Sequence, residues 1–196
     1  MTVQERQTTT VARRIAVGVM GPASGALSAE DCRLEPLARR LGIAIAGRGL
    51  LLVTGATTGI PEVVSRAARA AGGLTIGVSP AKSAQEHQSV FGLPADVAEV
   101  LIYTGFGLKG RNVINIRSSD IVLIVGGGMG TLNEFTIAYD EGKVIGALKG
   151  TGGIADHIDE VVGCCMPKPT QSRIIIKSVP EELLDACLAE LTSKRG

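Results

Sequence analysis

An α/β fold, in which helices cover both faces of a mainly parallel sheet, is predicted by three observations on this chain of 196 residues. Short apolar runs alternate with helical patterns along the sequence. Loops of glycine and other small residues follow several of these runs. The run 121–125 is apolar throughout, which is typical of a strand buried on both faces. The sequence therefore predicts a Rossmann-like three-layer αβα sandwich.

The first half of the chain supplies the first strands and helices of this sandwich. Residues 1–12 are polar and are expected to form a flexible tail, ahead of a single nucleotide- or cofactor-binding domain over residues 13–196. Apolar runs predict strands, and apolar residues that recur every three to four positions predict helices. Pro61 suits the first turn of a helix. In order we expect strand 14–20, helix 30–46, strand 50–54, helix 61–71, strand 74–78, an irregular polar segment 79–96 and strand 98–103.

The second half continues the alternation. Glycines and polar residues separate the apolar runs here as well. Glu181 and Glu182 suit the positive end of a last helix. In order we expect helix 111–118, strand 121–125, helix 131–141, strand 144–148, helix 154–162, strand 174–177 and helix 180–192.

Composition excludes several classes of partner. The net charge of +1 gives no field that would attract nucleic acid, and 3% aromatic residues without Trp offer no base-stacking platform. No apolar stretch approaches the roughly 20 residues that cross a bilayer. We therefore expect neither nucleic acid nor a membrane as a partner. A hydrophobic content of 45% favours a homo-oligomer, either a dimer or a tetramer.

The cysteines and histidines predict no bound metal. Cys32, Cys164, Cys165 and Cys187 lie in no metal-binding or secreted disulfide spacing, and the first residues form no hydrophobic leader. We therefore expect a cytoplasmic protein with reduced thiols. His87 and His157 are far apart in sequence and are expected at the surface or in loops.

A candidate anion site follows the strand 121–125. Gly126 to Gly130 allow the backbone to approach a ligand, and Thr131 begins a helix whose N–H groups face the same space. Small-residue loops after other strands fall on the same edge of a parallel sheet. The candidate ligand-binding residues are Gly21, Gly55, Thr57, Gly107, Lys109, Arg111, Asn112, Gly127, Gly128, Gly130, Thr131 and Glu134.

Two charged residues of this set have alternative interpretations. Glu134 follows Thr131 by three residues, so the pair could form a capping box, or the carboxylate could face ligand hydroxyls or a developing oxocarbenium ion. Arg111 begins a predicted helix, where a cation opposes the helix dipole unless an anion is near. Either reading of Glu134 remains open, and Arg111 is a candidate for pairing with phosphate.

The segment from Gly126 to Glu134, with Arg111 upstream, resembles the signature of the LONELY GUY phosphoribohydrolases, long misnamed lysine decarboxylases. Residues 105–114 and 133–143 are most similar to the molybdenum cofactor carrier branch of that superfamily. The chain departs from the enzymes at Gly126, where they have Pro, and at Asn112, where they have a basic residue. It also has Gly55-Ala56-Thr57 where they have three glycines.

The resemblance implies a carrier for a phosphorylated cofactor, either the molybdenum cofactor (molybdopterin) or a nucleotide. It leaves as an alternative the hydrolysis of the N-glycosidic bond of a nucleoside 5′-monophosphate, with Arg111 and Glu134 as catalytic residues. The missing basic neighbour at Asn112 favours the carrier. A nucleotide-sensing module is a third possibility.

Overall fold

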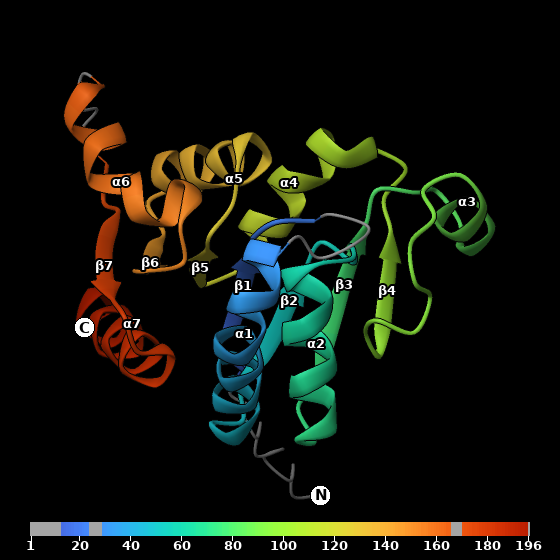
Figure 1. Ribbon diagram of the computed structural model, residues 1–196, viewed down its shortest axis with the longest axis horizontal. Coiled ribbons are helices and arrows are strands. Elements are labelled where there is room, and N and C mark those ends of the chain that lie inside the picture. The colour runs from blue at the N-terminus through green and yellow to red at the C-terminus, as the bar shows by residue number, and fades with distance from the viewer. Residues whose placement is uncertain (1–12, 24–28, 166–169, 196) are drawn as a thin grey trace, which may run out of the picture.

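A parallel sheet with helices on both faces forms the molecule (Figure 1). The computed structural model describes residues 13–23, 29–165 and 170–195, and in these ranges it has seven strands and seven helices. The strand order is β4-β3-β2-β1-β5-β6-β7, and every neighbouring pair is parallel. The predicted Rossmann-like three-layer fold is confirmed. The predicted tail, residues 1–12, lies outside the described residues.

Strands and helices alternate along the chain in the predicted order, with one additional helix. The bounds are β1 Ala16–Met20, α1 Ala29–Gly47, β2 Leu51–Thr54, α2 Ile60–Ala70, β3 Thr75–Ser79, α3 Ala84–Ser89, β4 Val100–Tyr103, α4 Gly107–Arg117, β5 Ile121–Val125, α5 Met129–Asp140, β6 Val144–Leu148, α6 Gly153–Cys164, β7 Arg173–Lys177 and α7 Pro180–Arg195.

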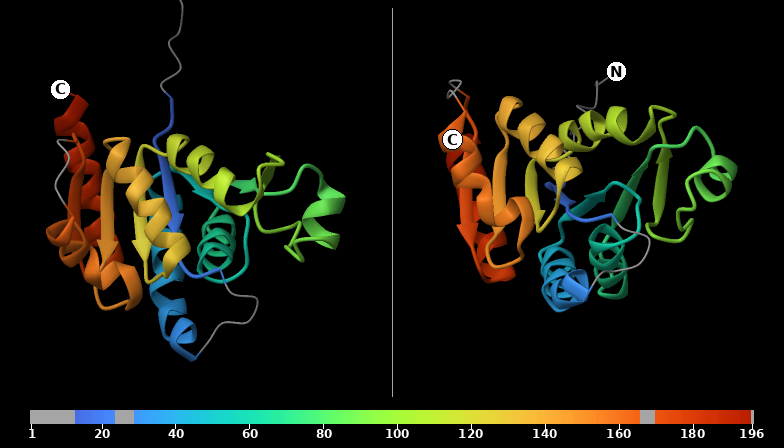
Figure 2. Two further views of the ribbon diagram at one scale, coloured as in Figure 1. Left: turned by 90° about the horizontal axis from the view of Figure 1, so that it is seen from above. Right: turned by 45° about the horizontal axis from the view of Figure 1, so that its top comes forward.

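The core divides into two apolar layers because the central strands are buried on both faces. On one face α1, α2 and α7 pack through residues such as Leu41, Val64 and Leu184. On the other face α4, α5 and α6 pack through Ile116 and Phe135, among others. Helix α3 lies beyond β4, at the end of the sheet (Figure 2).

Three predicted boundaries differ from the structure at the carboxyl edge of the sheet. The segment 79–96, predicted to be irregular, contains α3, which Ser83 caps by accepting a hydrogen bond from the Glu86 N–H. Helix α4 begins at Gly107 and not at 111, because the Gly107 N–H donates to the Pro80 carbonyl and fixes the turn there. Helix α5 begins at Met129, two residues before the predicted start.

The topology places a crevice where the strand order reverses. Strands β1 and β5 are neighbours, but the chain leaves β1 toward α1 on one face and β5 toward α5 on the other. The loops that follow two such strands diverge, which opens a space beyond their carboxyl ends. The candidate site lies in this space.

Candidate functional site

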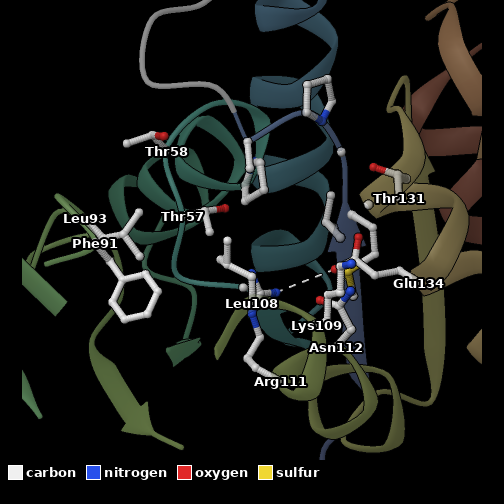
Figure 3. Close-up of a pocket in the computed structure, with 18 of the residues that line it drawn as sticks. Thr57, Thr58, Phe91, Leu93, Leu108, Lys109, Arg111, Asn112, Thr131 and Glu134 are labelled. Carbon is white, nitrogen blue, oxygen red and sulfur yellow. Dashed lines mark ion pairs between the residues drawn. The ribbon is translucent and has the colours of Figure 1, made fainter. Parts of the chain in front are cut away.

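A cavity of about 520 Å³ opens at the carboxyl ends of β1 and β2 (Figure 3). This volume is in the range of small-molecule binding sites. Its walls come from the strand ends, from the segment after α3, from the first turn of α2 and from the first two turns of α4 and α5. The lining residues are Val19, Met20, Gly21, Pro22, Ala23, Gly55, Thr57, Thr58, Pro61, Phe91, Gly92, Leu93, Leu108, Lys109, Arg111, Asn112, Gly130, Thr131 and Glu134.

Three helices begin at the cavity. Pro61 of α2, Lys109 of α4, and Gly130 and Thr131 of α5 all lie in the first turn of their helix and line the cavity. The first N–H groups of a helix have no partner within it, and the helix dipole makes this end positive. The cavity therefore favours a negatively charged group.

The buried Arg111 adds a full positive charge to the wall. Arg111 is 5% exposed, and its Nε is buried without a hydrogen-bond partner among the described residues. Its Nη1 lies 3.6 Å from the Glu134 Oε1, which is an ion pair too long for a hydrogen bond (Figure 3). A buried guanidinium whose donors are not all used is suited to bind an oxyanion.

Burial changes the protonation of this pair. It raises the pKa of Glu134 from its ordinary value of 4.5 to about 7, although the positive charge of Arg111 acts in the opposite direction. Burial also lowers the pKa of Arg111, an effect that Glu134 partly offsets. Near neutral pH the Glu134 carboxyl is thus a mixture of acid and carboxylate, which suits a proton donor or acceptor.

Glu134 does not form the capping box that was one of its two interpretations. The N-cap of α5 is Gly128, which makes no side-chain capping bond, and Thr131 is the third residue inside the helix. Glu134 instead lies beside Arg111 of α4. The interpretation of Glu134 as part of a helix cap is therefore wrong.

Most of the predicted binding residues line the same cavity. These are Gly21, Gly55, Thr57, Lys109, Arg111, Asn112, Gly130, Thr131 and Glu134. The structure does not place Gly107, Gly127 or Gly128 on its wall. Gly127 borders a separate cavity of about 530 Å³, together with residues 150–153 before and at the start of α6.

The amide of Asn112 joins two of the helices at the site. Its Nδ2 donates to the Asn133 Oδ1 at 2.9 Å, so α4 and α5 are held together beside the cavity. The basic residue that the LONELY GUY enzymes have at this position is thus replaced by a residue with a structural partner. Lys109 is exposed and contributes a positive charge at the cavity wall.

The apolar part of the wall was not predicted from the sequence. Phe91 and Leu93 come from the segment after α3, and Leu108 from the first turn of α4. The signal that could have indicated it was the presence of two apolar residues, Phe91 and Leu93, in the mainly polar segment 79–96. The prediction that His87 lies at the surface or in a loop is wrong, because this residue belongs to α3 and is fully buried. His157 is exposed, as predicted.

The described residues show neither a metal-binding cluster nor a membrane-spanning helix. In the described ranges, no group of three or more His, Cys, Asp or Glu side chains is placed to hold a metal ion. None of the helices in those ranges is long and apolar enough to span a bilayer. Cys164 and Cys165 are free and exposed at the end of α6.

Comparison with known proteins gives a family and three informative relatives. Residues 14–184 match the model of the SLOG cluster4 family. A cytokinin riboside 5′-monophosphate phosphoribohydrolase of Mycobacterium tuberculosis is 36% identical over 118 residues, which are 60% of each chain. The molybdenum cofactor binding protein of Rippkaea orientalis is 30% identical with a TM-score of 0.73, over 92% of this chain and 99% of that one. The molybdenum cofactor carrier protein of Chlamydomonas reinhardtii is 27% identical with a TM-score of 0.69, over the same shares.

Proposed function

The chain belongs to the SLOG cluster4 family, and we propose that it is a binding or carrier protein for a phosphorylated cofactor, the molybdenum cofactor or a related nucleotide. The family resemblance expected from the sequence motifs is confirmed by the two molybdenum cofactor proteins and the phosphoribohydrolase. The likeness to the two molybdenum cofactor proteins covers nearly the whole chain, which supports the carrier first.

The buried Arg111 carries this proposal. Burying a guanidinium is costly unless its charge is neutralised and its N–H donors have acceptors. Glu134, at 3.6 Å, supplies a negative charge but accepts no hydrogen bond from Arg111, whose Nε has no acceptor among the described residues. A phosphate monoester beside Arg111 would complete its hydrogen bonds. Gly130 and Thr131 line the same cavity in the first turn of α5, and their N–H groups would bind the other phosphate oxygens.

The donor set fits an organic phosphate better than a bare metal ion. Among the described residues, the cavity wall presents one guanidinium, one ammonium, first-turn helix residues and a carboxyl with a raised pKa, and it has no thiol or imidazole. In this proposal the cargo would be held through its phosphate and its ring system. The molybdenum would be part of the cargo and would have no protein ligand among the lining residues.

A transfer experiment tests the proposal. Molybdenum cofactor released from a molybdoenzyme is incubated with the protein under anaerobic conditions, and molybdenum is measured by mass spectrometry after gel filtration. We expect up to one molybdenum per chain, lost in Arg111→Ala and retained in Arg117→Ala. Arg117 is an exposed cation on the same helix and is the matched control. Equal retention by both variants would reject the assignment of Arg111, and no retention by the wild type would reject the cofactor.

A second candidate function, hydrolysis of a nucleoside 5′-monophosphate, is supported by Glu134. Its carboxyl lies in the cavity with a pKa of about 7, next to a cation suited to the substrate phosphate. As the C–N glycosidic bond breaks, the ionised form of Glu134 would stabilise the oxocarbenium-like sugar, and water would add to the anomeric carbon. The base would leave with the bonding electron pair and take up a proton.

Turnover distinguishes the two functions. Pure protein is incubated with a panel of nucleoside 5′-monophosphates, and free base is detected by chromatography. Release by the wild type and not by Glu134→Ala would establish the hydrolase. A lack of release in folded wild-type protein would favour the carrier.

A further inference from the structure

The cavity has two chemically different ends. In Figure 3 Phe91 and Leu93 lie at one end, and Thr131 and Glu134 lie at the other. Arg111 and the charged end of the cavity belong to α4 and α5, whereas the apolar end belongs to the segment after α3. A ligand that spans the cavity must therefore carry an anion at one end and an apolar surface at the other.

The apolar end is fixed in place by His87. This side chain is fully buried, its Nδ1 lies 2.8 Å from the Ser79 Oγ and its Nε2 lies 3.1 Å from the Pro94 carbonyl oxygen. The Leu93 N–H also donates to the His87 carbonyl at 3.0 Å. His87 thus ties the segment at Leu93 and Pro94 to Ser79 of β3, through its imidazole and its backbone carbonyl.

The partners of His87 determine its tautomer. The Pro94 carbonyl only accepts, so Nε2 carries the hydrogen and donates it. Nδ1 is then an acceptor for the Ser79 hydroxyl, whose oxygen in turn accepts from the Ala81 N–H at 3.1 Å. Every polar atom in this chain of bonds has a partner, which is the arrangement of a rigid support.

We propose that Phe91 and Leu93 form the subsite for the planar ring of the ligand, and that His87 is the positioning residue of this subsite. The inference rests on the proposed function, because it takes the phosphate to lie at Arg111. An aromatic ring and an aliphatic side chain select a flat heterocycle through stacking and apolar contact. The ligand class is therefore a planar heterocycle that carries a phosphorylated arm.

Three probes separate the contributions of the ring and the phosphate. AMP and neopterin monophosphate carry both groups, and ribose 5-phosphate carries only the phosphate. Their affinities for the full chain are measured by calorimetry. We expect at least one ring compound to bind the wild type about tenfold or more tightly than ribose 5-phosphate, in line with the effect of a stacked base.

Substitutions at Phe91 and His87 test whether these residues cause the tighter binding of the ring compound. Phe91→Ala should lower the affinity for the ring compound about tenfold and leave that for ribose 5-phosphate unchanged. His87→Gln should likewise lower the affinity for the ring compound relative to the affinity for ribose 5-phosphate. Val90→Ala is the matched control, since Val90 is 72% exposed, adjoins Phe91 and is absent from the cavity wall.

Each outcome is decisive. A ring compound that binds no more tightly than ribose 5-phosphate overturns the subsite, as does an equal loss for all probes in Phe91→Ala. In both cases ribose 5-phosphate still binds, so the proposed function survives. If no probe, ribose 5-phosphate included, binds the wild type, the proposed anion site and the ring subsite both fail.

Discussion

The guanidinium of Arg111 lies directly against the backbone of Gly55, so closely that a Cβ atom at residue 55 would overlap it. Gly55 follows the last residue of β2, and Arg111 lies in the second turn of α4. A side chain at residue 55 would displace the end of the Arg111 side chain, whereas the φ of Gly55 is not in the left-handed region and does not itself favour glycine. The contact connects the small-residue loop to the charge of the cavity.

We expect Gly55→Ala to displace Arg111 and weaken anion binding. Loss of a charge-assisted contact of about 1.5–3 kcal/mol would lower the affinity for ribose 5-phosphate roughly tenfold to a hundredfold. Titration calorimetry on folded protein checks this. Gly47→Ala, at the end of α1 with open space around it, should bind like the wild type. Unchanged binding by Gly55→Ala would show that Arg111 makes no contact with the anion.

The raised pKa of Glu134 makes stability depend on pH. The folded pKa of about 7 exceeds the ordinary value of 4.5, so the folded state binds the proton more tightly than the unfolded state. This stabilisation is complete below about pH 4.5 and is lost as the pH rises through about 7. It corresponds to about 3 kcal/mol.

Comparison with Glu134→Gln isolates this effect. The unfolding free energy of the wild type, relative to the variant, should fall between pH 5 and pH 8, as measured by urea denaturation. Groups other than Glu134 are present in both proteins, and their contributions cancel to first order. Parallel pH profiles would mean that Glu134 titrates normally.

Thr151 holds the start of the glycine loop after β5. Its Oγ1 accepts from the Gly126 N–H at 2.8 Å and donates to the Leu148 carbonyl at 2.5 Å. Thr151→Val should leave the buried Gly126 N–H unpaired and lower the unfolding free energy by about 2 kcal/mol. Thr192→Val, which removes an exposed hydroxyl from α7, should change it by less than about 0.5 kcal/mol. Similar values for the two variants in denaturant unfolding would contradict this role.

Ala56 has a left-handed backbone, with φ of 53°, and is fully buried. For a residue other than glycine this conformation costs roughly 1–2 kcal/mol, and its buried methyl group contributes about 0.8 kcal/mol. Ala56→Gly should therefore change the unfolding free energy by no more than about 1 kcal/mol, measured by thermal or urea unfolding. Ala38→Gly removes an equally buried methyl group from the interior of α1 and should destabilise clearly more. A larger loss at Ala56 than at Ala38 would refute this.

Local patterns were sufficient for the fold and for the edge of the sheet that holds the site. The apolar run Ile121–Val125 specifies a strand buried on both faces, and the glycines after it specify a sharp turn into a helix. These signals act between residues near one another in sequence, so the order of strands and helices followed from them. The candidate residues Gly21, Gly55 and Arg111 also followed, because loops after parallel strands meet at one edge.

Only the tertiary structure decided which side chains meet in the cavity. The sequence left two interpretations of Glu134 open; the start of α5 at Met129 excludes the capping box, and packing of α5 against α4 places the carboxyl beside Arg111. His87 is buried because Ser79 and Pro94 accommodate both of its ring nitrogens, which a polar sequence around it does not reveal. Such contacts join residues of different elements, and their geometry is set by packing between elements, which periodicity along the chain does not encode.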